Sequence, residues 1–344
     1  MEAFAPDQLP EVDAEIDCLY DTVRWLKEVK FKPSGATGEE RQRLARVLRT
    51  QSDICRASPM IVEHCDFGVF YGQKADHKEG SEAFDWFPPA VWNSDLQHVV
   101  VYIHGGFWRA LDLSESSHWA TPITQAGGVF VALAYRLAPW QTLHNMPISL
   151  CKALSHIYSH TQKRIQQILH ITPNIKIHLV GHSAGAQLAM ETFYAAHFKV
   201  GPYKDWLSAV NSLILISGLY DLRPLIHTTA NTALRLTSKE QAWTCSPLRY
   251  ITDNSSRILE YTRSVRWLIA WAQYDPPGFI EQSKCMITEL HKTLGNPAET
   301  TFLSEIETFC IADEDHFTSI EGLHYGPATS TLLKRIVQFL RLDQ

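Results

Sequence analysis

The sequence predicts an α/β protein built on a mostly parallel, doubly wound sheet with helices on both faces. Three observations support this fold class. Short apolar segments such as His98–Ile103 are typical of strands that a parallel sheet buries on both faces. From that segment onward, strand-like runs alternate with stretches of helical periodicity, including residues 147–168. The chain also lacks repeats, low-complexity tracts and Pro/Gly/Ser-rich linkers, which favours one domain over two.

The amino-terminal region differs from the rest of the chain. Its polar, amphipathic segments at 13–31 and 37–55 predict a helical arm over residues 1–60, followed by a single α/β domain over residues 61–344. Within that domain we expect strands at 61–67, 83–87, 98–103, 128–134, 175–180, 213–217, 265–272 and 301–309. We expect helices at 147–168, after the 175–180 strand to about residue 198, at 279–294 and at 328–342.

The segment around Ser183 carries the most specific chemical pattern. The expected strand 175–180 runs directly into Gly181-His182-Ser183-Ala184-Gly185, and helix-forming residues follow. Strand, G-x-S-x-G and helix together are typical of a nucleophile elbow, in which the serine occupies a strained, sharp turn. A side chain two residues away on either side would collide with neighbouring backbone, so Gly181 and Gly185 are expected for structural reasons.

Partners for this serine are expected where other strands end, because functional residues in open α/β sheets gather at the carboxyl ends of the strands. Asp275 and His316 follow two later strands. In this interpretation His316 is the general base for Ser183, and Asp275 orients the imidazole. Asp221 remains an alternative acid and His324 an alternative base.

An oxyanion hole is expected from two segments. The backbone N–H of Ala184 lies at the start of the helix after the elbow, where free N–H groups favour negative charge. One or two further N–H groups are expected from Gly105, Gly106 and Phe107, which follow the buried strand at 98–103. His104 is expected to anchor this loop through hydrogen bonds rather than to react.

Taken together, these motifs resemble the kynurenine formamidases, or arylformamidases, a branch of the α/β hydrolases; the Ser, Asp, His order along the chain is also that of the wider group. The resemblance extends from about Tyr71 to the last strand, and Phe107 stands where tyrosine is commoner. It is carried by His104–Trp108, Gly181–Ala186, Ser217–Leu225, Ser246-Pro247, Tyr274–Pro277 and Asp315–Phe317.

This resemblance implies an α/β-hydrolase fold and hydrolysis of N-formyl-L-kynurenine to kynurenine and formate, a step of tryptophan degradation. We expect Phe107, Trp108 and Tyr220 to form aromatic walls for an arylamine leaving group, with Trp108 narrowing the acyl side of the site. A small-acyl carboxylesterase and an inactive hydrolase-like binding protein are the competing interpretations.

Composition excludes several other functions. A formal net charge of −6 argues against nucleic acid or an anionic membrane as the main partner. No apolar run predicts a membrane span or signal peptide, and seven scattered cysteines suit a reducing compartment, so a cytoplasmic location is expected. No nucleotide-binding loop or metal-ligand cluster occurs, and His156 and His160 are interpreted as a solvated helix face; neither cofactor nor metal is expected. The expected partner is a small-molecule substrate, and a homodimer is left open.

Overall fold

The computed structural model describes residues 9–27, 39–58, 64–72, 79–93, 95–198, 203–253, 256–294 and 305–342. Parts of several expected elements, namely 28–31, 37–38, 61–63 and 301–304, lie outside these ranges.

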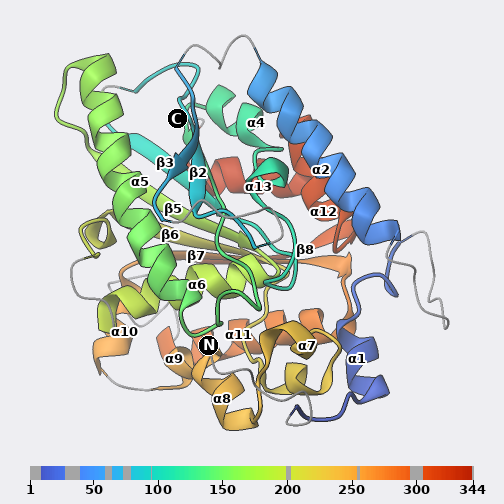
Figure 1. Ribbon diagram of the computed structural model, residues 1–344. Helices are drawn as coiled ribbons and strands as arrows, with labels where there is room; N and C mark the ends of the chain where they lie inside the picture. The colour runs from blue at the N-terminus through green and yellow to red at the C-terminus, as the bar shows by residue number, and fades with distance from the viewer. Residues whose placement is uncertain are drawn as a thin grey trace.

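A single eight-stranded sheet forms the centre of the molecule (Figure 1). The strands are β1 Asp66–Phe70, β2 Ala83–Phe87, β3 Gln97–Ile103, β4 Val129–Leu133, β5 Ile175–His182, β6 Val210–Ile216, β7 Arg266–Tyr274 and β8 Ile306–Asp315. Their order is β1-β2-β4-β3-β5-β6-β7-β8. All pairs from β4 to β8 are parallel, while β2 is antiparallel to both of its neighbours.

The connections place a topological switch point between β3 and β5. From β3 the chain passes to β4 on one side, then crosses to β5 on the other side of β3. In open α/β sheets ligands bind outside the carboxyl ends of the strands at such a point, because the two following connections diverge to opposite sides. The topology therefore predicts a binding site at the loops after Ile103 and His182.

Helices cover both faces of the sheet. They are α1 Ala14–Tyr20, α2 Glu39–Ala57, α4 Ala120–Gln125, α5 Met146–Leu169, α6 Ala184–Phe198, α7 Asn231–Leu234, α8 Lys239–Thr244, α9 Leu248–Thr252, α10 Ser256–Arg263, α11 Pro277–Leu294, α12 Thr318–Glu321 and α13 Thr331–Leu340. In Figure 1, α2, α4, α12 and α13 lie on one face, and α5, α6 and α11 on the other.

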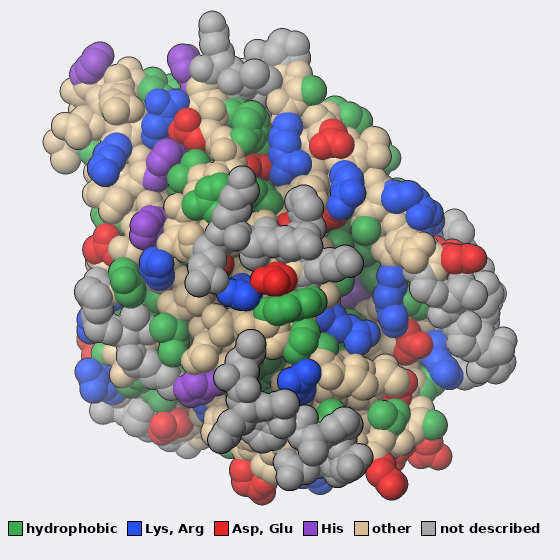
Figure 2. Space-filling view, viewed as in Figure 1, with side chains coloured by type: hydrophobic (Ala, Val, Ile, Leu, Met, Phe, Trp, Pro, Cys, Tyr) green, Lys and Arg blue, Asp and Glu red, His purple; other side chains and the backbone are tan. Residues whose placement is uncertain are grey.

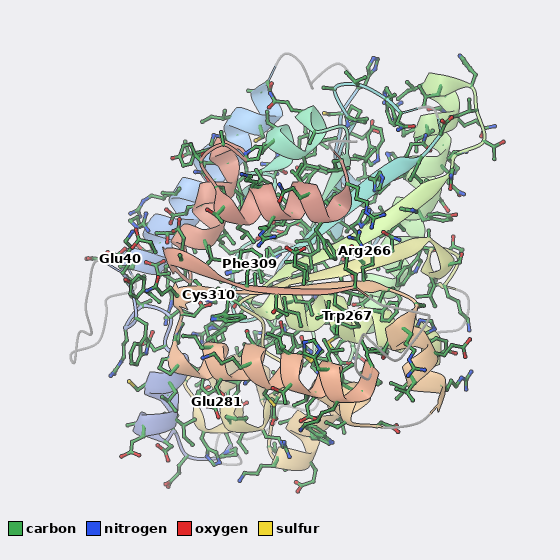
Figure 3. The ribbon with its side chains drawn as sticks, turned by 180° about the vertical axis from the view of Figure 1, so that it is seen from behind. Glu40, Arg266, Trp267, Glu281, Phe309 and Cys310 are labelled. Atoms are coloured by element: carbon green, nitrogen blue, oxygen red, sulfur yellow. The ribbon has the colours of Figure 1, made fainter. Side chains whose placement is uncertain are left out.

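Alternate residues of each strand contribute side chains to the cores on opposite faces of the sheet. Seen from behind in Figure 3, Arg266 and Phe309 point toward α13, whereas Trp267 and Cys310 point toward α11. Accordingly Trp267 belongs to the hydrophobic core under α11, and the Arg266 guanidinium donates to the carbonyl of Phe339 in α13. This period of two builds one apolar core on each side of the sheet.

The predicted fold class is confirmed: the sheet is mostly parallel and helices flank both faces. Three element predictions differ most from the structure. The strand expected over 61–67 begins at Asp66 and runs to Phe70. The helix in the 13–31 segment ends at Tyr20, because Asp21 is extended and its carboxylate accepts from the N–H of Val23, so residues 21–27 form turns. The last strand, expected to end at residue 309, continues to Asp315, since an edge strand tolerates charged residues.

The amino-terminal segments pack directly on the α/β core. Leu44 and Leu48 of α2 and Val23 belong to the same buried cluster as Phe317 and Ile320. Five arginines lie along α2, of which Arg41, Arg46 and Arg49 are exposed and Arg43 and Arg56 are partly buried. Figure 2 shows Lys and Arg side chains along this flank of the molecule. Within the described ranges, no helix has both the length and the apolar character needed to cross a bilayer.

Candidate active site

Ser183 occupies a strained turn between β5 and α6. Its φ of 56° lies in the left-handed region, and its N–H donates to the carbonyl of Ile216 at 2.8 Å. A Cβ at Gly181 would lie 2.2 Å from the carbonyl oxygen of Gly185, and one at Gly185 would lie 2.0 Å from that of Ile103. Backbone therefore crowds both sides of the turn, which is the physical reason for the two glycines.

Asp275 and His316 form a buried pair beside this turn. Nδ1 of His316 lies 2.7 Å from Oδ1 of Asp275. Because a carboxylate only accepts, this bond places a proton on Nδ1 and leaves Nε2 as the basic nitrogen of the neutral ring. The second carboxylate oxygen accepts from Ser217 Oγ at 2.6 Å and from the N–H of Ala272 at 2.7 Å. Three hydrogen bonds thus hold Asp275 in place.

The imidazole of His316 is packed between two other rings. The ring of His182 lies 4.6 Å away, centroid to centroid, and that of Phe279 also lies 4.6 Å away. Nε2 of His182 hydrogen-bonds the carbonyl oxygen of His316 at 3.1 Å. Burial, reinforced by the charge of a protonated His316, lowers the pKa of His182 well below its ordinary value. His182 is therefore a neutral spacer, as its position inside the elbow suggests.

A cavity of about 90 Å³ opens over Ser183 and His316. Gly106 and Phe107 form one side, and Phe317 and Ile320 another. Ser183 Oγ and the His316 imidazole both line this space, although no hydrogen bond joins them among the described residues. Catalytic hydrogen bonds are often long in an unliganded site and shorten when substrate binds. A larger hollow of about 940 Å³ between residues 25–27 and α11 reaches Asp275 but neither Ser183 nor His316.

The loop after β3 approaches Ser183 closely. A Cβ at Gly105 would lie 3.0 Å from that of Ser183, and Gly106 has a φ of +95°. Phe107 and Trp108 also have positive φ values of 50° and 58°. Gly106 and Phe107 both line the cavity. Ala184 directly follows Ser183 as the first residue of α6, and the first N–H groups of a helix lack intrahelical acceptors.

His104 holds the base of this loop. Its ring stacks on Tyr135 with centroids 4.4 Å apart, and its Nδ1 lies 2.9 Å from the carbonyl oxygen of Gly105. The Tyr135 hydroxyl donates to the carbonyl of His104 at 3.0 Å. Burial lowers the pKa of the His104 imidazole, so the ring is neutral. The anchoring role of His104 stays a prediction, and these contacts are the ones through which it would act.

Two of the three expected aromatic walls do not line the cavity over Ser183. Trp108 is fully buried, and its indole N–H donates to Oε1 of Gln187 at 2.8 Å. Tyr220 is also buried, with its hydroxyl beside Gly218. Only Phe107 borders the cavity. The prediction for Trp108 is wrong because Gly106, Phe107 and Trp108 all have left-handed backbone, which turns the Trp108 side chain into the core. Local sequence does not indicate this turn.

The alternative residues lie elsewhere. Asp221 pairs with Arg223 at 2.7 Å, and Nδ1 of His324 contacts the carbonyl of His118. Conversely, sequence analysis missed Ser217, which supports Asp275, and three residues that close the cavity, namely Thr22, Arg41 and Arg109. Ser217 could have been found as the residue that follows β6; no local pattern marks the other three.

Comparisons with known proteins identify the fold and the family. Residues 100–296 match a family described as having the alpha/beta hydrolase fold. The chain is 27% identical over 311 residues to a kynurenine formamidase of Danio rerio, covering 90% of each chain. It is 30% identical over 257 residues to a kynurenine formamidase of Salmo salar, covering 74% of this chain and 77% of that one.

The chain belongs to the kynurenine formamidase family of α/β hydrolases. It is accordingly a hydrolase of the arylformamidase class.

Solved structures share the fold. A thermostable carboxylesterase cloned from a metagenomic library superimposes with a TM-score of 0.59 at 15% identity, covering 91% of this chain and 99% of that one. An esterase of Pyrobaculum calidifontis gives a TM-score of 0.57 at 16% identity, covering 97% and 98%. Among the described residues of the present chain, no group of three or more His, Cys, Asp or Glu side chains is arranged to hold a metal ion.

Proposed function

We propose that this protein hydrolyses the formamide of N-formyl-L-kynurenine to L-kynurenine and formate, a step of tryptophan degradation, with Ser183, His316 and Asp275 as a catalytic triad. The observation that carries the proposal is the 2.7 Å His316–Asp275 pair beside a strained Ser183 in a chain of this family. Both Ser183 and His316 border one cavity, so a single substrate carbonyl can reach both side chains.

The reaction follows from these positions. Ser183 Oγ attacks the formyl carbon while its proton passes to Nε2 of His316. The carbonyl oxygen becomes an oxyanion that accepts from the N–H of Ala184 and from N–H groups of the Gly105–Phe107 loop. His316 then gives the proton to the arylamine nitrogen as the C–N bond breaks, which releases kynurenine and leaves a formyl ester on Ser183. Water, deprotonated by His316, attacks this ester, and His316 returns the proton to Ser183 Oγ as the C–O bond breaks and formate leaves.

The enclosure of Ser183 supports a small acyl group. The serine is 2% exposed, and a Cβ at Gly105 would lie 3.0 Å from the Cβ of Ser183, so little space remains beside the nucleophile for a long acyl chain. We therefore expect phenyl acetate to be cleaved more slowly than the formamide, and octanoyl esters to be poor substrates.

The test is hydrolysis of N-formyl-L-kynurenine, followed by kynurenine absorbance, for the wild type and for Ser183→Ala. The exposed serine variant Ser208→Ala is the matched control, and thermal melting checks that each variant folds. Turnover that Ser183→Ala abolishes and Ser208→Ala retains is the expected result. A wild type that cleaves phenyl acetate but not N-formyl-L-kynurenine would overturn the proposed substrate and favour a small-acyl esterase.

A further inference from the structure

Two guanidinium groups border the cavity over Ser183. Arg109 comes from the loop after β3, and Arg41 comes from α2 in the amino-terminal region. The described residues of the cavity wall include no aspartate or glutamate. The other wall positions are mostly apolar, among them Leu44, Leu111 and Phe317. The cavity therefore combines apolar walls with a positive charge that no wall residue balances.

The two arginines differ in how their charge is balanced. Arg41 donates to Oδ1 of Asp21 at 3.0 Å. For the Arg109 guanidinium, no hydrogen bond or ion pair occurs among the described residues. The nearby carboxylate of Asp17 is engaged by the N–H and the hydroxyl of Thr229 at 2.8 and 2.9 Å. Burial, together with the like charge of Arg41, lowers the pKa of Arg109, although an arginine stays protonated at any physiological pH.

A half-buried guanidinium without a partner is unfavourable, because it has lost part of its hydration without gaining a compensating charge. A bound anion would remove that cost. Arginine is also the side chain best suited to a carboxylate, since its planar fork donates two parallel hydrogen bonds.

The backbone of the loop that carries Arg109 is anchored. The N–H of Arg109 donates to the carbonyl of Gly106 at 3.1 Å, and the preceding Trp108 is locked into the core by Gln187. Gln187 in turn donates to the carbonyl of Cys245 at 2.9 Å. The same anchored loop therefore carries both the expected oxyanion donors and Arg109, whose guanidinium has no partner among the described residues.

We propose that Arg109, assisted by Arg41, binds a carboxylate on the tail of the substrate and so selects anionic aryl formamides over neutral ones. The inference rests on the proposed function and deepens it, because the α-carboxylate of N-formyl-L-kynurenine is such a tail. The apolar wall residues would contact the aryl ring, and the formyl group would lie over Ser183.

The first measurement compares kcat and KM for N-formyl-L-kynurenine with those for 2′-formamidoacetophenone, a neutral analogue that lacks the amino-acid tail. Charge-assisted hydrogen bonds are strong enough that Arg109→Gln should reduce the preference for the anionic substrate by about 10- to 100-fold, mainly through KM. Arg109→Lys should recover part of the preference, because it keeps the charge but not the fork. Arg41→Gln should reduce the preference less, about threefold, since Asp21 already balances that charge.

Arg43→Gln is the matched control. Arg43 lies on the same helix as Arg41 but pairs with Glu321 at 2.9 Å, and it does not border the cavity. It should leave the preference unchanged. If Arg109→Gln reduces turnover of both substrates by the same factor, Arg109 merely supports the loop and the proposal is wrong.

A second measurement separates this proposal from the proposed function. L-kynurenine and its methyl ester are compared as competitive inhibitors of phenyl acetate cleavage, which does not require N-formyl-L-kynurenine to be a substrate. Tighter inhibition by the free acid in the wild type, lost in Arg109→Gln, supports the carboxylate site. Equal inhibition by acid and ester in the wild type would overturn it, whatever the enzyme does with N-formyl-L-kynurenine.

Discussion

The base of the cavity and its cover are held in place by different interactions. At the base, Ser183, Asp275 and His316 are each at most 3% exposed, and short hydrogen bonds fix the carboxylate and the imidazole. The cover consists of α2 and residues 21–27, and besides its apolar contacts it is attached by ion pairs such as Arg43–Glu321, in which the arginine is 39% exposed. Buried hydrogen bonds tolerate little change, whereas exposed ion pairs contribute little free energy each. The proposed chemistry therefore depends on the base, whereas the cover contributes Arg41, the lesser of the two arginines proposed to select the substrate.

The largest effect is expected at the base. Asp275→Asn should reduce kcat/KM by about 10⁴-fold, because an amide can no longer hold the His316 imidazole with its proton on Nδ1. The matched control is Asp221→Asn, since Asp221 also follows a strand but pairs with an exposed arginine. That variant should stay within about twofold of the wild type. A greater loss in Asp221→Asn than in Asp275→Asn would reassign the acid.

An intermediate effect is expected where α2 meets the sheet. Arg56 contacts Oδ2 of Asp85 at 2.7 Å, and this carboxylate is only 2% exposed. Arg56→Ala should lower the free energy of unfolding by about 3 kcal/mol, because it leaves a buried charge without its partner. Asp85 keeps hydrogen bonds from Gly68 and Ser117, which moderate the loss.

Arg43→Ala, on the same helix, tests the contrast. Its side chain is 39% exposed, so removal of the pair with Glu321 should cost no more than about 1 kcal/mol. Urea denaturation of both variants measures the difference. Equal losses of unfolding free energy in Arg56→Ala and Arg43→Ala would contradict the distinction between a pair with a buried carboxylate and a more exposed pair.

The smallest effect is a dependence of stability on pH. It is expected from His98 at the start of β3 and His178 within β5, away from the carboxyl ends of the strands that carry the candidate triad. Burial lowers the pKa of His98 to about 4, and that of His178, whose Nε2 lies 2.9 Å from Nδ1 of His98, is well below its ordinary value. Both rings are neutral in the folded state, whereas the unfolded chain binds protons near pH 6.5. The contribution of these two rings to the free energy of unfolding is therefore constant above about pH 6.5 and decreases as the pH falls toward 4.

The melting temperature should therefore fall as the pH is lowered from about 7.5 to about 4.5. His98→Gln should reduce the dependence on pH, and the exposed His291→Gln should not. An unchanged slope in His98→Gln would show that other groups control acid stability.

Much of the fold could be predicted because its signals are local. Strands β3 and β5 are continuous apolar runs, and the G-x-S-x-G turn is specified by glycines that backbone crowding requires. The acid and base could be proposed from their order along the chain and their places after β7 and at the end of β8. Their catalytic roles remain predictions until the variants are measured.

The sequence by itself determined most of the elements and the elbow, since each depends on residues adjacent along the chain, and it suggested the candidate triad through the order of Ser183, Asp275 and His316 after successive strands. Only the tertiary structure decided what surrounds them. Trp108 points into the core because its backbone is left-handed, and Arg41 and Arg109 meet at one cavity although α2 and the β3 loop are far apart in sequence. Hydrophobic periodicity encodes which residues are buried, but it does not encode which distant side chains share a wall.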